Sequence, residues 1–369
     1  MIPLWKLKRE LTRIKQQLRL PFSWAAAMLE TRLRLRGKGR HRQHPARLSE
    51  GQIARLPDIA LVLIYQPAGL PASLFATCRH LVAQGFAPFI VSNTALRDDD
   101  RIRLLETCYL IMERPNVGYD FGGYRDGILH LLDEAARPDN RLVMPDNLLV
   151  MNDSIWFPLF DNCTLLAEIR AQPHDLFGPV YNARVKKPHR SHLQSYMFNF
   201  SRAALDRPAF RTYWERLVTS ANKQLVIRMC EMRMTQAFRD AGFSVGYKWT
   251  AADGVAALRA LPDADLRRAL DYMGRLDRKI ARTLNRLRTG SAAGISQTAV
   301  LDALLDRHPT TPYLLKLPPG LLIDAVRLPF LKKDRHLPYQ LQRAALLQDP
   351  AATPVNPVIQ AEIAGWDRT

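Results

Sequence analysis

Ile59-Ala-Leu-Val-Leu-Ile64 is an unbroken run of apolar residues. Such a run is typical of a strand buried on both faces, as in a parallel sheet covered by helices. Apolar runs elsewhere predict further strands at 88–92, 108–112 and 148–151, with helices between them at 71–84, 98–107 and 124–136. Strands that alternate with helices indicate right-handed βαβ units and a mainly parallel α/β sheet.

The later elements are less regular. We expect strands at 175–178, 196–200 and 243–249 and helices at 207–218 and 222–240. After residue 250 the pattern is helical and lacks strand-like runs. The sequence therefore predicts three parts: an N-terminal arm (1–50), an α/β domain (51–250) and a helical C-terminal region (251–369).

The charge is concentrated in the arm. The chain of 369 residues has a net charge of +18, and residues 1–47 hold 13 Lys/Arg but only two acids. Leu4, Leu7, Leu11, Ile14 and Leu18 recur at helical spacing between these basic residues, and a second helix is expected after Pro21. A basic amphipathic arm is suited to an anionic membrane surface. Packing on the protein body or binding a partner are the alternatives.

The four cysteines are widely spaced, and neither a signal peptide nor a membrane span is recognisable. We therefore expect reduced cysteines and a cytoplasmic protein, peripheral on the inner face of the plasma membrane if the arm binds lipid.

Polar residues follow three of the predicted strands. Asn93 ends one, the segment from Asn116 to Gly127 follows the next, and Asn152-Asp153-Ser154 follows another. Ligands of open parallel sheets bind beyond the carboxyl ends of the strands, so we expect one convergent site.

Two of these clusters have a structural alternative to a binding role. Gly118, Gly122 and Gly123 permit close approach to a phosphate before a helix, but they also suit a tight strand-to-helix turn. Asp153 is placed to bind a divalent cation on a diphosphate, or to cap a helix. Neither the dinucleotide-binding glycine motif nor the P-loop spacing is present.

Three segments resemble the rhamnan synthesis protein F family. They are Asn116-Val-Gly-Tyr-Asp-Phe-Gly-Gly-Tyr-Arg-Asp-Gly127, Leu149-Val-Met-Asn-Asp-Ser154 and His192-Leu-Gln-Ser-Tyr-Met-Phe198. Ile227 to Phe243, and His308-Pro-Thr with Pro329-Phe-Leu-Lys-Lys333, are also similar to that family, so the resemblance covers about 58–335. The first two segments look like motifs of inverting glycosyltransferases with the GT-A fold.

The resemblance implies a GT-A-like glycosyltransferase. It would move a sugar, with rhamnose one option, from a nucleoside-diphosphate donor to a cell-surface polysaccharide, such as a lipopolysaccharide, or to its lipid-linked precursor. The implied donor-binding residues are Asn93, Asn116, Gly118, Asp120, Gly122, Gly123, Asn152 and Asp153. Asp153 would stand at the second Asp of an Asp-x-Asp metal motif, for Mg²⁺ or Mn²⁺. Met151-Asn152 precede it, so the motif holds a single carboxylate.

No catalytic base is carried over securely. Asp126, His192 and Glu231 are the candidates, because a carboxylate or imidazole can take the proton of the attacking hydroxyl. An isolated His is more often structural, and Glu231 also suits an ordinary helix surface.

Two other functions remain open. A non-catalytic nucleotide-sugar-binding or assembly protein would keep the fold and lack the base. A nucleic-acid-binding protein would explain the charge, but that charge lies mainly in the arm and no nucleic-acid-binding motif is present, so no nucleic-acid partner is expected.

Overall fold

The computed structural model describes residues 20–36, 46–137, 143–184, 187–289, 296–308 and 313–366. The amphipathic helix expected over Leu4–Leu18 lies outside these residues. The first half contains the elements α2 (Leu20–Leu35), β1 (Arg47–Glu50), β2 (Asp58–Ile64), α3 (Ala72–Ala83), β3 (Phe86–Ser92), α4 (Asp98–Leu105), β4 (Leu110–Glu113), α5 (Tyr119–Ala135), β5 (Asn147–Asn152), β6 (Ile155–Trp156), α6 (Leu165–Arg170) and β7 (Leu176–Asn182).

The second half of the described chain is mostly helical. Its elements are η1 (Pro188–Arg190), β8 (His192–Leu193), β9 (Met197–Ser201), α7 (Arg202–Leu205), α8 (Pro208–Arg216), α9 (Lys223–Val226), the π-helical turn η2 (Ile227–Glu231), α10 (Met232–Asp240), β10 (Val245–Trp249), α11 (Ala251–Arg259), α12 (Asp263–Leu276), α13 (Arg278–Thr289), α14 (Gln297–Arg307), η3 (Leu314–Lys316), η4 (Leu321–Ala325), β11 (Leu331–Lys332), α15 (Leu337–Gln348) and α16 (Pro357–Trp366).

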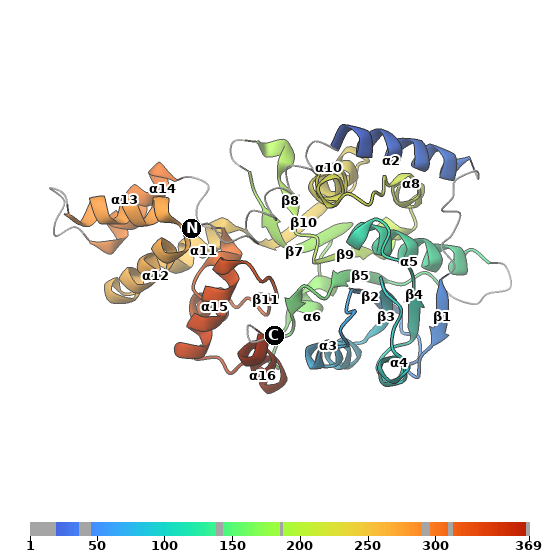
Figure 1. The fold of residues 1–369 in the computed structure, drawn as a ribbon, viewed down its shortest axis with the longest axis horizontal. Coiled ribbons are helices and arrows are strands. Elements are labelled where there is room, and N and C mark those ends of the chain that lie inside the picture. Colours follow the sequence, from blue (N-terminus) through green and yellow to red (C-terminus); the bar gives the residue numbers. More distant parts are fainter. Residues whose placement is uncertain are drawn as a thin grey trace, which may run out of the picture.

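A nine-stranded sheet forms the centre of the molecule, in the order β1-β4-β3-β2-β5-β9-β7-β10 with β8 paired to β7 (Figure 1). The strands β4, β3, β2 and β5 are parallel, β9 runs antiparallel between β5 and β7, and β10 is parallel to β7. The predicted fold class, an α/β protein with a mainly parallel sheet flanked by helices, is confirmed. The carboxyl ends of β2, β3, β4, β5, β7 and β10 all lie at one edge of the sheet.

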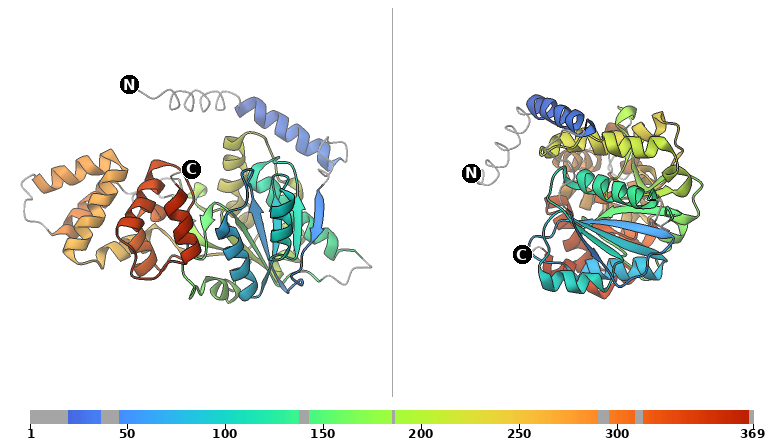
Figure 2. Two further views of the ribbon diagram at one scale, coloured as in Figure 1. Left: turned by 60° about the horizontal axis from the view of Figure 1, so that its bottom comes forward. Right: turned by 90° about the vertical axis from the view of Figure 1, so that its right-hand side faces the viewer.

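Alternate side chains of β2 point to opposite faces of the sheet and pack into two apolar clusters. Ile59, Leu61 and Leu63 pack with α5, α8 and α10 on one face of the sheet. Ala60, Val62 and Ile64 pack with α3 and α6 on the other face, and the apolar cluster there continues into the C-terminal helices. Figure 2 shows these helical layers from the side. Burial on both faces explains why this strand has no polar residue between its ends.

The C-terminal region is joined to the α/β domain at several points. Strand β11 pairs with β6 directly after β5, the backbone N–H of Asn356 donates to the Leu159 carbonyl at 2.6 Å, and α16 packs against α3. Helices α12, α13 and α14 extend away from the sheet (Figure 1). The domain boundaries near 50 and 250 stay predictions, although β1 inside the proposed arm pairs with β4.

Helix α2 lies on the outer side of the layer formed by α8 and α10 (Figure 2). Ala27 and Thr31 are buried, and the Asn222 amide donates to the Ser23 hydroxyl at 3.3 Å. Phe22 and Leu29, which are one heptad apart, remain 79% and 58% exposed. This part of the arm therefore packs on the body and leaves apolar side chains in water.

No helix in the described ranges is long and apolar enough to cross a membrane. Cys78, Cys108, Cys163 and Cys230 are all buried and form no disulfide, as expected.

Candidate functional site

The loop after β4 turns into α5 earlier than the sequence predicts. The predicted start at Tyr124 is wrong, because α5 begins at Tyr119 and its N-cap residue Gly118 has a φ of 80°. That left-handed conformation favours glycine, and a Cβ at Gly118 would lie 2.9 Å from the Cβ of Thr219. Asp120 therefore sits in the first turn of the helix, where the backbone dipole favours a carboxylate.

Close packing accounts for the next two glycines. A Cβ at Gly123 would lie 2.1 Å from a methyl carbon of Leu63 on β2, and one at Gly122 would lie 2.0 Å from the Val117 carbonyl oxygen. Both positions let α5 approach the sheet and its own preceding loop. Gly122 and Gly123 therefore serve packing inside α5, the tight strand-to-helix turn is made at Gly118, and the approach of all three to a donor stays a prediction.

A polar network centred on Arg114 holds this loop. The buried Arg114 guanidinium donates to the Asp126 carboxylate at 2.7 Å, to the Val117 carbonyl at 2.8 Å and to the Asn93 side chain. Asp126 also pairs with Arg125 at 2.7 Å. The Asn93 amide group donates to the Tyr119 carbonyl at 3.2 Å. Asn93 and Asp126 are therefore both engaged with the protein, while Asn116 in the same loop is exposed.

The residues after β5 converge with Asp120. The Asn152 amide group donates to the Asp120 carboxylate at 3.0 Å, and its carbonyl oxygen accepts from the Ser154 hydroxyl at 2.6 Å. Asp153 accepts from the Tyr65 backbone N–H at 3.0 Å and from the Gln66 amide group at 2.8 Å, both after β2. Of the three predicted strand ends, the structure joins the one after β5 to Asp120 at the start of α5, and it adds the end of β2, which was not predicted.

The two carboxylates are electrostatically coupled. Burial, then the negative charges of Asp153 and Glu231, raise the pKa of Asp120 to about 6. Burial also raises the pKa of Asp153, while its hydrogen bond from Tyr65 and the charge of Lys333 act in the opposite direction. A site with this concentration of negative charge favours a cationic or proton-bearing ligand.

Lys332 on β11 and Lys333 directly after it complete the charged cluster, and the sequence predicted no role for either. Lys333 reaches the Ser73 hydroxyl at 2.6 Å and Glu362 at 3.4 Å, and its backbone N–H donates to the Ser154 carbonyl at 2.8 Å. Lys332 lies over the Tyr196 ring, with Nζ 4.3 Å from the centroid.

Lys332 differs from Lys333 in having no counterion in direct contact. Its ammonium has no hydrogen bond or ion pair with any residue in the described ranges. Burial lowers the pKa of Lys332, and the charges of Glu231, Asp334 and Asp120 act against that shift. The run Lys332-Lys333 was the sequence signal, but only the β11–β6 pairing places it beside Asp153.

Glu231 ends a π-helical turn between α9 and α10. Such turns are rare and frequently occur at functional sites. Within the described part of the chain its carboxylate has neither a hydrogen-bond donor nor an ion-pair partner. It is close enough to Asp120 and Lys332 to shift the pKa of both. Glu231 therefore joins the strand-end cluster, although it is far from that cluster in sequence.

Glu231 and His192 also line a cleft of about 780 Å³ at the carboxyl ends of β7 and β10. His192 is buried, and its Nδ1 lies 2.7 Å from the Arg190 carbonyl oxygen, an arrangement that has Nδ1–H donating and leaves Nε2 as an acceptor. The structure thus brings two of the three candidate bases to one cleft, and it places Asp126 in the Arg114 network instead.

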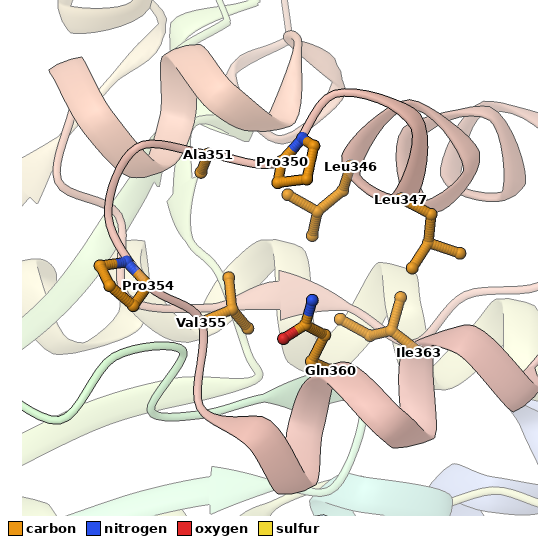
Figure 3. Close-up of a pocket in the computed structure, with 8 residues that line it drawn as sticks. All are labelled: Leu346, Leu347, Pro350, Ala351, Pro354, Val355, Gln360 and Ile363. Carbon is orange, nitrogen blue, oxygen red and sulfur yellow. The ribbon is translucent and has the colours of Figure 1, made fainter.

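A second, smaller cavity of about 130 Å³ lies in the C-terminal region, between α15, α16 and the loop that joins them (Figure 3). Its lining is apolar apart from Gln360, and it contains no titratable group. We assign it no chemistry.

No three His, Cys, Asp or Glu side chains of the described residues are grouped closely enough to hold a metal ion. A protein-only metal centre is therefore not seen in that part of the chain, and a metal role for Asp153 stays a prediction.

Known proteins resemble this chain in sequence and in structure. The family model for rhamnan synthesis protein F matches residues 89–253, which contain Asp120, Asn152, Asp153, His192 and Glu231. A protein of Sinorhizobium fredii (strain NBRC 101917 / NGR234), described as uncharacterized protein y4gN, is 34% identical over 370 residues, with 100% of this chain and 93% of the relative covered.

The chain belongs to the rhamnan synthesis protein F family.

Two solved structures are similar to this rhamnan synthesis family member at low scores. A putative nucleotide-diphospho-sugar transferase from Desulfovibrio desulfuricans G20 is 14% identical with a TM-score of 0.29, covering 69% of this chain and 98% of the other. Mannosyltransferase PcManGT from Pyrobaculum calidifontis, in complex with GDP-Man and Mn²⁺, is 11% identical with a TM-score of 0.30, covering 93% and 89%. Scores this low carry no argument about activity.

Proposed function

We propose that this rhamnan synthesis family member is a glycosyltransferase that moves a sugar, with rhamnose one option, from a nucleoside-diphosphate donor to a polysaccharide or its lipid-linked precursor. The observation that carries the proposal is the carboxylate of Glu231, which has no hydrogen bond or ion pair with the described residues and borders both the charged strand-end cluster and the cleft. A donor and an acceptor need to meet at one such point.

The donor diphosphate is assigned to the strand-end cluster. Lys332 offers an ammonium that has no direct counterion among the described residues, and Lys223, exposed at the start of α9, adds a second positive charge near Asp120. Cationic side chains stabilise the charge that grows on a leaving phosphate. Asn116, exposed in the loop before α5, is free to contact the nucleotide or the sugar.

A divalent cation fits this cluster only together with the donor. Mg²⁺ is commonly held by one or two carboxylates plus substrate phosphates. Asp120 and Asp153, whose charges disfavour each other, would be the protein ligands. When bound, the cation would offset negative charge on the diphosphate.

Glu231 is assigned as the general base. The acceptor hydroxyl oxygen attacks the anomeric carbon as the bond from that carbon to the phosphate oxygen breaks, and the electron pair leaves with the nucleoside diphosphate. The hydroxyl proton goes to the Glu231 carboxylate. His192 would orient the acceptor, and Asn93, Asn152 and Asp126 would position the loop and Asp120 through their hydrogen bonds.

The proposed membrane contact is the exposed apolar side of α2, together with the basic residues that precede this helix in the sequence. It would keep the enzyme close to lipid-linked acceptors, on the cytoplasmic side of the plasma membrane.

The experiment titrates UDP, GDP and dTDP, and their sugar conjugates, into the full chain by calorimetry and follows turnover of the conjugates. At least one nucleotide should bind, Asp153→Ala should weaken it, and the matching sugar conjugate should be consumed. Binding without turnover across the panel, with rhamnan acceptors present, would instead favour the non-catalytic binding protein. A folded Asp153→Ala protein with wild-type binding and turnover would refute the assignment of the site.

A further inference from the structure

The cleft beside Glu231 is bounded by two separate parts of the chain. One wall comes from the carboxyl ends of β7 and β10, including Tyr181 and Tyr247. The facing wall comes from the C-terminal region, including Tyr313, Lys316 and Tyr339. Because the Tyr313 hydroxyl donates to the Gln194 side chain at 2.9 Å, the two walls are directly connected. The C-terminal region therefore shapes this cleft as well as packing on the core.

Two aromatic rings form a platform in the lining of the cleft. The rings of Tyr181 and Tyr247 are stacked, with centroids 4.6 Å apart and an interplanar angle of 9°. Arg239 fixes Tyr181 from behind by donating to its hydroxyl at 3.1 Å. Tyr247 is nevertheless 44% exposed, which is unusual for an aromatic ring already packed on another ring.

The remaining lining is mixed: half of it is apolar, Arg184, Glu231 and Lys316 are charged, and the rest is neutral and polar. Asn182, His192 and Gln194 contribute amide and imidazole groups, which can both donate and accept. Thr250, Tyr313 and Tyr339 add hydroxyl groups to the same lining. An exposed ring beside many neutral hydrogen-bonding groups suits a ligand with one apolar face and a rim of hydroxyls, which describes a pyranose.

We propose that this cleft binds the acceptor glycan, with Tyr247 stacked on Tyr181 as the platform for a sugar ring and with the reactive hydroxyl directed toward Glu231. The inference rests on the proposed function and adds the acceptor site to it. Two cationic side chains, Arg184 and Lys316, also line the cleft, so nucleoside-diphosphate binding is measured beside glycan binding in the test below.

The test measures binding of rhamnan oligosaccharides of three to six sugars, prepared by partial acid hydrolysis, to the full chain. Tyr247→Ala removes the exposed ring and should weaken binding at least tenfold, equivalent to about 1.4 kcal/mol. Tyr247→Phe is the matched control, since the Tyr247 hydroxyl has no hydrogen bond with the described residues, and it should stay within about twofold of wild type.

Ala252→Trp provides a second variant in case the loss of the ring affects folding. Ala252 is exposed on α11 and lines the cleft, so a larger side chain there fills the space and removes no native contact. It should also abolish oligosaccharide binding. Nucleoside-diphosphate affinity should be unchanged in all three variants.

Wild-type affinity for the oligosaccharide in both Tyr247→Ala and Ala252→Trp would overturn the inference. Loss of nucleoside-diphosphate binding in these variants would overturn it too, because the cleft would then hold the donor. If the wild-type chain binds nucleotide and no glycan, this inference fails and the donor site stands. If it binds neither, the proposed function itself fails.

Discussion

Replacing Asp120 with Asn should stabilise the protein at neutral pH and impair its activity. Asp120 lies in the first turn of α5, accepts from Asn152 at 3.0 Å, and has Asp153 and Glu231 as negatively charged neighbours. An amide of the same shape can keep the hydrogen bond and carries no charge. The substitution therefore isolates the free-energy cost of holding an ionised carboxylate at this position.

The size of the expected stability difference follows from the pKa of Asp120. Burial and the neighbouring carboxylates raise the pKa of Asp120 from 3.8 to about 6. Two units correspond to about 3 kcal/mol. The pKa of Asp120 is higher in the folded than in the unfolded protein. The favourable contribution of its protonated form to stability is therefore fully present below pH 4 and is lost as the pH rises to about 6. The free energy of unfolding of Asp120→Asn should thus equal that of wild type near pH 4. Near pH 7 it should be higher by about 3 kcal/mol, which corresponds to a Tm higher by about 4 °C.

The assay is thermal unfolding of both proteins, without nucleotide, from pH 4 to pH 8. Asp126→Asn is the matched control in the same helix. Its carboxylate pairs with Arg114 and Arg125, both at 2.7 Å, so its loss should destabilise the protein by about 3 kcal/mol at neutral pH. A difference between Asp120→Asn and wild type that does not vary with pH would refute the electrostatic description of the cluster.

Three other substitutions test separate parts of the structure. Gly123→Ala places a Cβ 2.1 Å from Leu63, so it should lower the free energy of unfolding by about 2 kcal/mol, and an unchanged Tm would contradict the packing of α5 on β2. Lys332→Gln should weaken nucleoside-diphosphate binding about tenfold by calorimetry, in line with the loss of one charge-assisted contact, whereas unchanged affinity would remove this lysine from the donor site. Replacing Phe22 and Leu29 with Ser should reduce co-sedimentation with anionic vesicles and leave Tm within about 1 °C, and full vesicle binding would exclude α2 as the contact.

The sheet could be predicted from the sequence because its signal is local. The run from Ile59 to Ile64 is β2 except for one residue, since burial on both faces demands apolar residues at every position. The start of α5 could not be predicted in the same way. Glycines favour loops in general, and only the contacts of Gly122 and Gly123 with Val117 and Leu63 place them inside a helix.

The sequence predicted several residues of the candidate site but not the hydrogen bonds and ion pairs that connect them. Sequence order indicated that Asp120, Asn152 and Asp153 follow strand ends, and they do converge. That Asn93 is engaged by Arg114 could not be foreseen, because this contact depends on the exact packing of the loop. Lys332 was also missed, since a two-residue strand such as β11 has no periodicity to detect.

Glu231 is the proposed base that joins the donor cluster to the cleft, and the proposed transfer depends on it most directly. The decisive measurement is release of nucleoside diphosphate from the sugar donor, with and without a rhamnan oligosaccharide, by wild type and by Glu231→Gln. Wild type should show acceptor-dependent release, and Glu231→Gln should lose at least a hundredfold of that rate while its donor affinity stays within about twofold of wild type. A Glu231→Gln protein that transfers at the wild-type rate would contradict the account.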